Sequence, residues 1–76
     1  MTPGQLQDLL VATLTRTAGG SQRRWRLAVG PVRVYDRATH AHCNWSVTPS
    51  GNPQEVAAIE SLIDGVRASH PFVRGG

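Results

Sequence analysis

The chain has 76 residues, which is the size of one small domain and leaves no room for a second. Its formal net charge is +3, and all eight of its strongly basic residues are arginines. Guanidinium groups bind carboxylates and phosphates in a bidentate manner, so this composition favours an anionic partner. No segment approaches the run of about 20 apolar residues that a membrane-spanning helix needs, and we expect no membrane partner.

A single cysteine, Cys43, excludes an internal disulfide and is typical of a reducing compartment. The N-terminus has neither a charged leader region nor a long apolar run, so we expect a cytoplasmic protein. The sequence contains no motif with a recognised catalytic mechanism. We therefore expect neither enzymatic activity nor a cofactor.

The first predicted element is a helix over residues 3–17. Thr2 is placed to cap it, Pro3 suits its first turn, and Gln5 stands at the capping-box position. Leucines recur along it at spacings of three and four residues and form an apolar stripe: Leu6, Leu9, Leu10 and Leu14. Gly19-Gly20 ends the helix.

Three strands are predicted over 23–29, 32–37 and 42–48, because polar and apolar residues alternate there with the period of a pleated strand. Gly30-Pro31 fits the two-residue turn of a hairpin between the first two strands. The residues expected to face the core are Trp25, Leu27, Val29, Val32, Val34, Cys43, Trp45 and Val47.

A second helix is predicted over 53–68, with Asn52 as its cap and Glu55 at the capping-box position. Its apolar stripe consists of Val56, Ile59, Leu62, Ile63 and Val66. His70-Pro71 ends this helix and a short C-terminal tail follows. The predicted fold is a single α+β domain of order α-β-β-β-α, a three-stranded antiparallel meander with both helices packed on one face.

The uncovered face of this sheet is the candidate site. We expect it to bind an anionic partner, either nucleic acid or an acidic protein surface, through Arg24, Arg26, Arg33, Tyr35, Arg37 and His42. Arg24 would lie opposite Arg37, an unfavourable pairing unless an anion lies between them. Tyr35 and His42 are available to stack on a base. The alternatives are a solvated polar face without a ligand and a structural, self-associating homodimer.

His40, His42 and Cys43 form a short group of metal-ligating side chains. The two histidines are two residues apart on a predicted strand and point the same way, whereas Cys43 points to the opposite face. The paired Cys and His spacings of zinc sites are missing, so no metal site is predicted. Cys43 would face inward beside Trp45, which makes it an unreactive thiol rather than a nucleophile.

The predicted order of elements resembles that of double-stranded RNA-binding domains. Gly30-Pro31 falls between the first two strands, where that family carries a Gly-Pro-His loop, and Val32 stands in place of the histidine. Asn52-Pro53-Gln54-Glu55 replaces the basic cluster with which the family grips phosphates, so the resemblance implies the order of elements only. The ending Val73-Arg74-Gly75-Gly76 is similar to the tail of ubiquitin-like proteins, whose fold opens with a hairpin rather than a helix.

Overall fold

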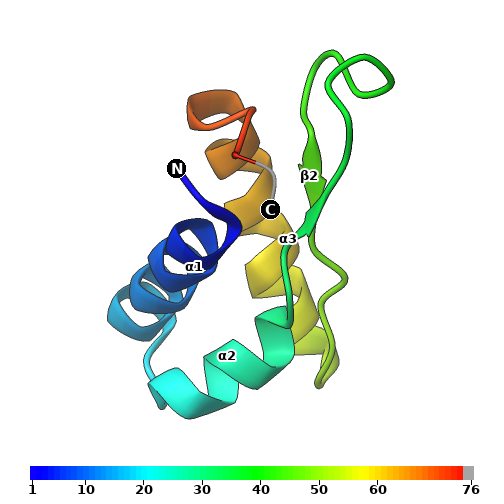
Figure 1. Cartoon of the computed structure of the whole chain (residues 1–76). Helices are drawn as coiled ribbons and strands as arrows, with labels where there is room; N and C mark the ends of the chain where they lie inside the picture. Colours follow the sequence, from blue (N-terminus) through cyan, green and yellow to red (C-terminus); the bar gives the residue numbers. More distant parts are fainter. Residues whose placement is uncertain (75–76) are drawn as a thin grey trace.

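The computed structural model describes residues 1–74, which form three helices and one two-stranded antiparallel sheet. In chain order the elements are α1 (Pro3–Ala18), α2 (Gln22–Val29), β1 (Arg33–Val34), β2 (Trp45–Ser46) and α3 (Pro53–Ser69). The three helices surround a common core and the sheet lies beside α3 (Figure 1). The predicted three-stranded meander covered by two helices is therefore wrong, because a third helix takes the place of the first strand.

The helices predicted over 3–17 and 53–68 are confirmed, since they correspond to α1 and α3. Thr2 Oγ1 accepts the backbone N–H of Gln5 at 3.2 Å, and Gln5 Oε1 accepts the N–H of Thr2 at 2.9 Å. Asn52 and Glu55 form the same reciprocal pair at the start of α3. Both helices turn an apolar face to the core, and their buried residues are Leu6, Leu10, Val11, Leu14, Ile59 and Ile63.

The segment predicted as the first strand is the helix α2, and its two ends carry the signals for this. Ser21 Oγ accepts the N–H of Arg24 at 3.1 Å and caps the helix. Gly30, with φ of 67°, ends it and donates its N–H to the carbonyl of Arg26 at 3.0 Å. The residues between are mostly glutamine, arginine, leucine and alanine, which are strong helix formers.

The helical period of α2 changes which of its residues reach the core. Trp25, Ala28 and Val29 lie at positions i, i+3 and i+4, and all three are buried. Leu27, which the strand pattern places inside, points outward and is 72% exposed. The Trp25 indole N–H donates to the carbonyl of Gly19 at 2.6 Å and so closes the corner between α1 and α2.

The hairpin is much shorter than the predicted strands over 32–37 and 42–48. Arg33 pairs with Ser46 and Val34 with Trp45. The chain then leaves the sheet because Asp36 starts a turn, in which its Oδ1 accepts the N–H of Ala38 at 2.8 Å. The predicted alternation is nevertheless correct around β1, since Val32 and Val34 pack against the core while Arg33 and Tyr35 are exposed.

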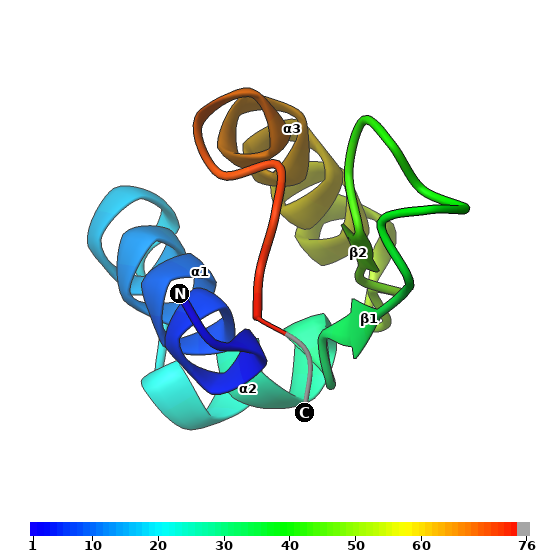
Figure 2. The ribbon, with the colours of Figure 1, turned by 45° about the horizontal axis from the view of Figure 1, so that its top comes forward.

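Residues 70–74 form an extended segment that runs between α1 and the hairpin (Figure 2). Asn44 is 3% exposed, and its side-chain amide bonds both the N–H and the carbonyl of Val73, at 2.8 and 2.9 Å. The Trp45 indole N–H donates to the carbonyl of His70 at 2.7 Å. The alternation predicted over 42–48 would place Asn44 on the outer face of the sheet, and this is wrong, because its amide pairs with the backbone of the C-terminal segment. Gly75-Gly76 lies outside the described residues.

Replacing Asn44 by alanine should lower the free energy of unfolding by about 2 to 4 kcal/mol, because two buried backbone groups of Val73 lose their partners. That loss is comparable to the whole stability of a domain of this size. Urea denaturation at neutral pH measures it. The matched control is His42→Ala, an exposed position on the same hairpin. Equal stability of the two variants would show that the Asn44 amide does not hold the C-terminal segment.

Candidate functional site

The structure divides the predicted arginine face between two parts of the molecule. Arg24 and Arg26 lie on α2, whereas β1 and the loop that follows it carry Arg33, Tyr35, Arg37 and His42. The loop between β1 and β2 projects at one end of the molecule and α2 lies at the other (Figure 1). The expected pairing of Arg24 with Arg37 across a sheet does not occur, because Arg24 is part of a helix.

Arg24 joins α2 to the start of α3 by a bidentate ion pair with Glu55. Its Nε lies 2.7 Å from Glu55 Oε2, and its Nη2 lies 2.9 Å from Glu55 Oε1. The same Oε1 also accepts the N–H of Asn52 at 3.0 Å. The hydrogen bond from Arg24, followed by the backbone bond from Asn52, lowers the pKa of Glu55 to about 2. Gly51 has a φ of 115°, and any other residue there would place its Cβ only 2.6 Å from Glu55 Oε1.

Arg26 lies on the opposite flank of α2 and joins it to α1. Its Nη1 is 3.0 Å from Asp8 Oδ1 and 3.2 Å from Gln7 Oε1. Gln7 in turn donates to the carbonyl of Gly30 at 2.6 Å, which fixes the C-terminal end of α2. Both arginines of the predicted site on α2 thus balance a carboxylate of the protein itself.

The hairpin carries a pair of stacked rings. The rings of Tyr35 and His40 are 4.4 Å apart between centroids and 17° from parallel. Tyr35 Oη is 3.0 Å from Ser46 Oγ, and His40 Nδ1 is 2.9 Å from Thr39 Oγ1, so both rings have a fixed position. His40 is not among the residues predicted for the anionic face. The turn that brings it onto Tyr35 begins at Asp36, whose carbonyl accepts the N–H of His40 at 2.9 Å.

Arg33 and Arg37 lie on either side of Tyr35 in the sequence, and both are exposed. Arg37 lies over the ring of Phe72, 4.2 Å from its centroid. Within residues 1–74, neither Arg33 nor Arg37 forms an ion pair with a carboxylate. The nearest acidic residue in the sequence, Asp36, uses its Oδ1 in the turn. The hairpin therefore presents two arginines, Arg33 and Arg37, that form no ion pair within the described part of the protein, with the carboxylate of Asp36 between them in the sequence.

The histidines and the cysteine are not assembled into a metal centre in the described part of the chain. No group of three His, Cys, Asp or Glu side chains there could hold an ion. His40 is engaged in the ring stack and His42 is exposed. Cys43 is half-buried, and its thiol donates to the carbonyl of Trp45 at 3.4 Å.

Comparisons of the chain with known protein families, with curated proteins and with solved structures find no match. None of the helices within residues 1–74 has both the length and the apolar character needed to cross a membrane.

Acid should weaken the Arg24–Glu55 clamp in a defined pH range. Because folding lowers the pKa of Glu55 from 4.5 to about 2, the stabilisation is complete above about pH 4.5 and is lost as the pH falls towards 2. The urea midpoint should fall over this range in the native protein and fall less in Glu55→Gln, which keeps an amide at the capping position. Glu60→Gln, an exposed position on the same helix, should behave like the native protein. A Glu55→Gln variant with the native pH profile would contradict the assignment.

Proposed function

We propose that this protein is a small non-enzymatic binding module whose β1–β2 hairpin binds an anionic partner, and that this partner is a single strand of nucleic acid. The observation that carries the proposal is the stack of Tyr35 on His40, with Arg33 and Arg37 on either side of Tyr35 in the sequence. Aromatic rings accept bases on their faces, and guanidinium groups bind phosphates. Both requirements are met on one hairpin.

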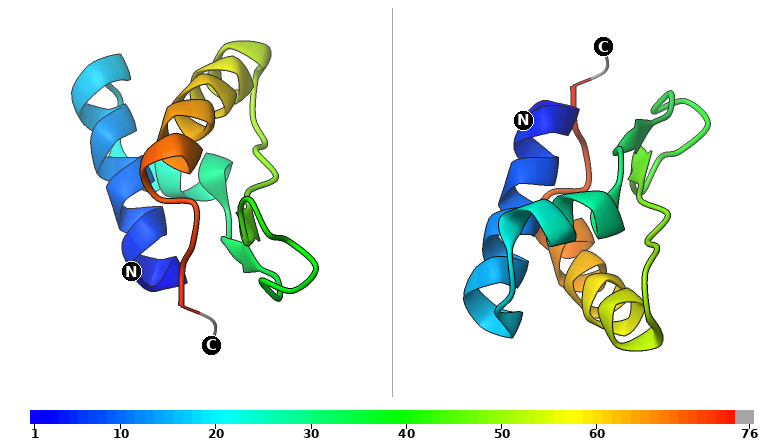
Figure 3. Two further views of the ribbon diagram at one scale, coloured as in Figure 1. Left: turned by 90° about the horizontal axis from the view of Figure 1, so that it is seen from above. Right: turned by 90° about the horizontal axis from the view of Figure 1, so that it is seen from below.

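Exposure of the rings favours an unpaired strand over a duplex. His40 is exposed and Tyr35 is 39% exposed, so a base can approach the stack from solvent. The bases of a duplex are stacked on one another, whereas those of a single strand are free to stack on protein rings. The hairpin loop also projects beyond the helices, which leaves room for a strand to pass (Figure 3).

The hairpin is a better candidate for this role than the arginines of α2. Arg24 and Arg26 each hold a carboxylate of the protein, and a phosphate would have to compete with Glu55 and Asp8. Arg33 and Arg37 have no such competitor among the described residues. An acidic protein surface would satisfy these two charges as well, but it would have no need for the ring stack.

The test is the binding of fluorescent single- and double-stranded DNA and RNA oligonucleotides over a series of salt concentrations. Two arginine–phosphate contacts to a single strand predict that log K falls with log salt with a slope of about −1.4. Arg37→Gln should reduce the size of that slope by about 0.7, because one contact is removed. Arg16→Gln, on α1 and away from the hairpin, is the matched control and should leave the slope unchanged.

The ring stack is tested by a pair of substitutions at Tyr35. Tyr35→Leu should weaken single-strand binding by about fivefold to 100-fold, because the face for a base is lost. Tyr35→Phe keeps the ring, loses only the contact of its hydroxyl with Ser46, and should bind nearly as the native protein does. Absence of single-strand binding at low salt, or equal binding by the two variants, would refute the proposal.

A further inference from the structure

The outer surface of α2 is a second surface that the proposed nucleic-acid site does not use. We propose that it docks an acidic segment of a partner protein, which inserts apolar side chains beside Leu27. Leu27 is 72% exposed, against 38% for Met1 and 39% for Tyr35, the other exposed large apolar residues of the described chain. No other element lies over α2 in the view from below (Figure 3).

Leu27 stands between two hollows in the surface. The larger, about 580 Å³, lies between the first turns of α1 and the C-terminal end of α2, and Gly30, Pro31 and Val32 form its far wall. The smaller, about 160 Å³, lies between α2 and the Ser50-Gly51 loop. Leu27 therefore projects between two hollows, and side chains of a partner could enter the hollows and contact it from both sides. Burial of this leucine removes apolar surface from water and stabilises the complex.

Each hollow is bordered by an arginine that keeps unused hydrogen-bond donors. Arg26 borders the larger hollow and uses Nη1 for Asp8 and Gln7, which leaves its Nε and Nη2 without a partner among residues 1–74. Arg24 borders the smaller hollow and uses Nε and Nη2 for Glu55, which leaves Nη1. These spare donors could reach a partner's carboxylate without displacing Glu55 or Asp8, but the charges of Arg24 and Arg26 are already balanced within the protein.

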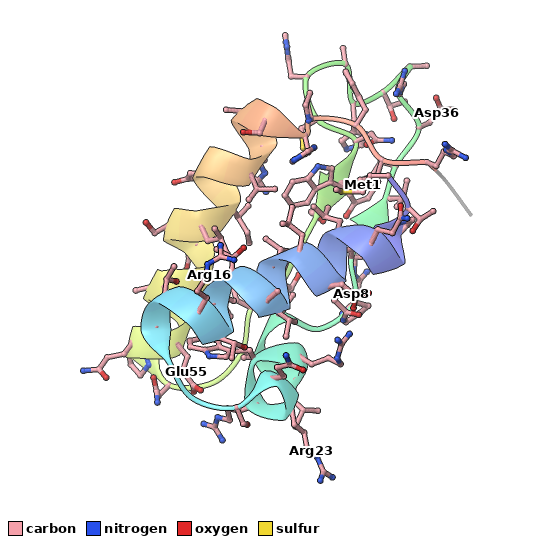
Figure 4. All side chains as sticks on the ribbon, turned by 90° about the vertical axis from the view of Figure 1, so that its left-hand side faces the viewer. Met1, Asp8, Arg16, Arg23, Asp36 and Glu55 are labelled. Atoms are coloured by element: carbon pink, nitrogen blue, oxygen red, sulfur yellow. The ribbon has the colours of Figure 1, made fainter. Side chains whose placement is uncertain are left out.

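Arg23 adds a charge that no carboxylate within residues 1–74 balances. It precedes Leu27 by four residues, so the two side chains lie on the same ridge of the helix. Arg23 points away from the body of the protein (Figure 4). With Asp8 and Glu55 each balanced by an arginine, the excess positive charge beside the leucine calls for an acidic occupant.

The same charges argue against the two other occupants. In a symmetric contact between two copies of α2, Arg23 of one copy would face the arginines of the other copy, which is unfavourable. Nucleic acid would satisfy the arginines but would leave Leu27 against phosphates and sugars, and no aromatic ring is exposed on α2 for a base. An acidic segment with apolar side chains would bury Leu27 and also balance the charge of Arg23.

A phage-displayed library of random peptides provides the probe, selected on the full native chain and depleted on Leu27→Ser. We expect the enriched peptides to be rich in Asp and Glu and to contain apolar residues. A synthetic peptide from this set should bind Leu27→Ser and Arg23→Glu about tenfold or more weakly than the native protein. His40→Ala, which disrupts only the proposed nucleic-acid site, should bind the peptide as the native protein does. Failure of the hairpin proposal therefore leaves this result unaffected.

Several results would overturn the proposal. These are the absence of enrichment over the Leu27→Ser protein, enrichment of peptides without acidic residues, and loss of oligonucleotide binding in Arg23→Glu. A dimer in sedimentation equilibrium that Leu27→Ser dissociates would assign the surface to a second copy. Because Leu27 is exposed, Leu27→Ser should keep the native circular dichroism and urea midpoint, and a variant with both intact reports on binding alone.

Discussion

The fold depends on one buried polar contact, the pair of hydrogen bonds between the Asn44 amide and the backbone of Val73. Strands of two residues are too short to hold a hairpin by themselves, since an isolated two-stranded hairpin is marginal in water. The amide supplies the pairing that a third strand would supply, and it brings Val73 into the core, where 2% of its surface remains exposed. The N–H of Arg74 then donates to the carbonyl of Met1 and joins this segment to the start of α1. The direction in which the hairpin carries Tyr35 follows from this contact.

On α2, the residues that hold the fold together differ from those that remain free to contact a partner. Its inner side buries Trp25, Ala28 and Val29, and its two flanks are held to α3 and α1 by Arg24 and Arg26. A group that holds the fold together is a poor choice for a ligand, because binding would have to replace an internal contact. What remains for a partner on this helix is its outer ridge. The same reasoning applies to the hairpin, where the turn uses Asp36 and leaves the arginines without a competing carboxylate.

The sequence predicts α1 and α3 well because each has its cap, its proline and its apolar stripe within one continuous segment. It is ambiguous at α2, since Trp25 and Val29 fit both a strand period and a helix period. The end signals at Ser21 and Gly30 and the helix-forming residues between them favour the helix. Asn44 could not be placed from local pattern, because its partner lies 29 residues away and a polar residue between apolar ones reads as exposed. The ring stack was equally hidden, since it depends on how the turn at Asp36 folds back. The predicted arginine face is divided because residues 22–29 form a helix and not the first strand of the sheet.

The two proposed surfaces differ in what drives binding, and they adjoin at the start of β1, where Val32 lines the larger hollow beside α2 and Arg33 belongs to the hairpin site. The molecule extends 37 Å along its longest axis and 19 Å across, with the hairpin loop and α2 at opposite ends (Figure 1). A domain of this size that binds a nucleic-acid strand through its hairpin and an acidic segment through α2 would act as an adaptor that brings its two partners together.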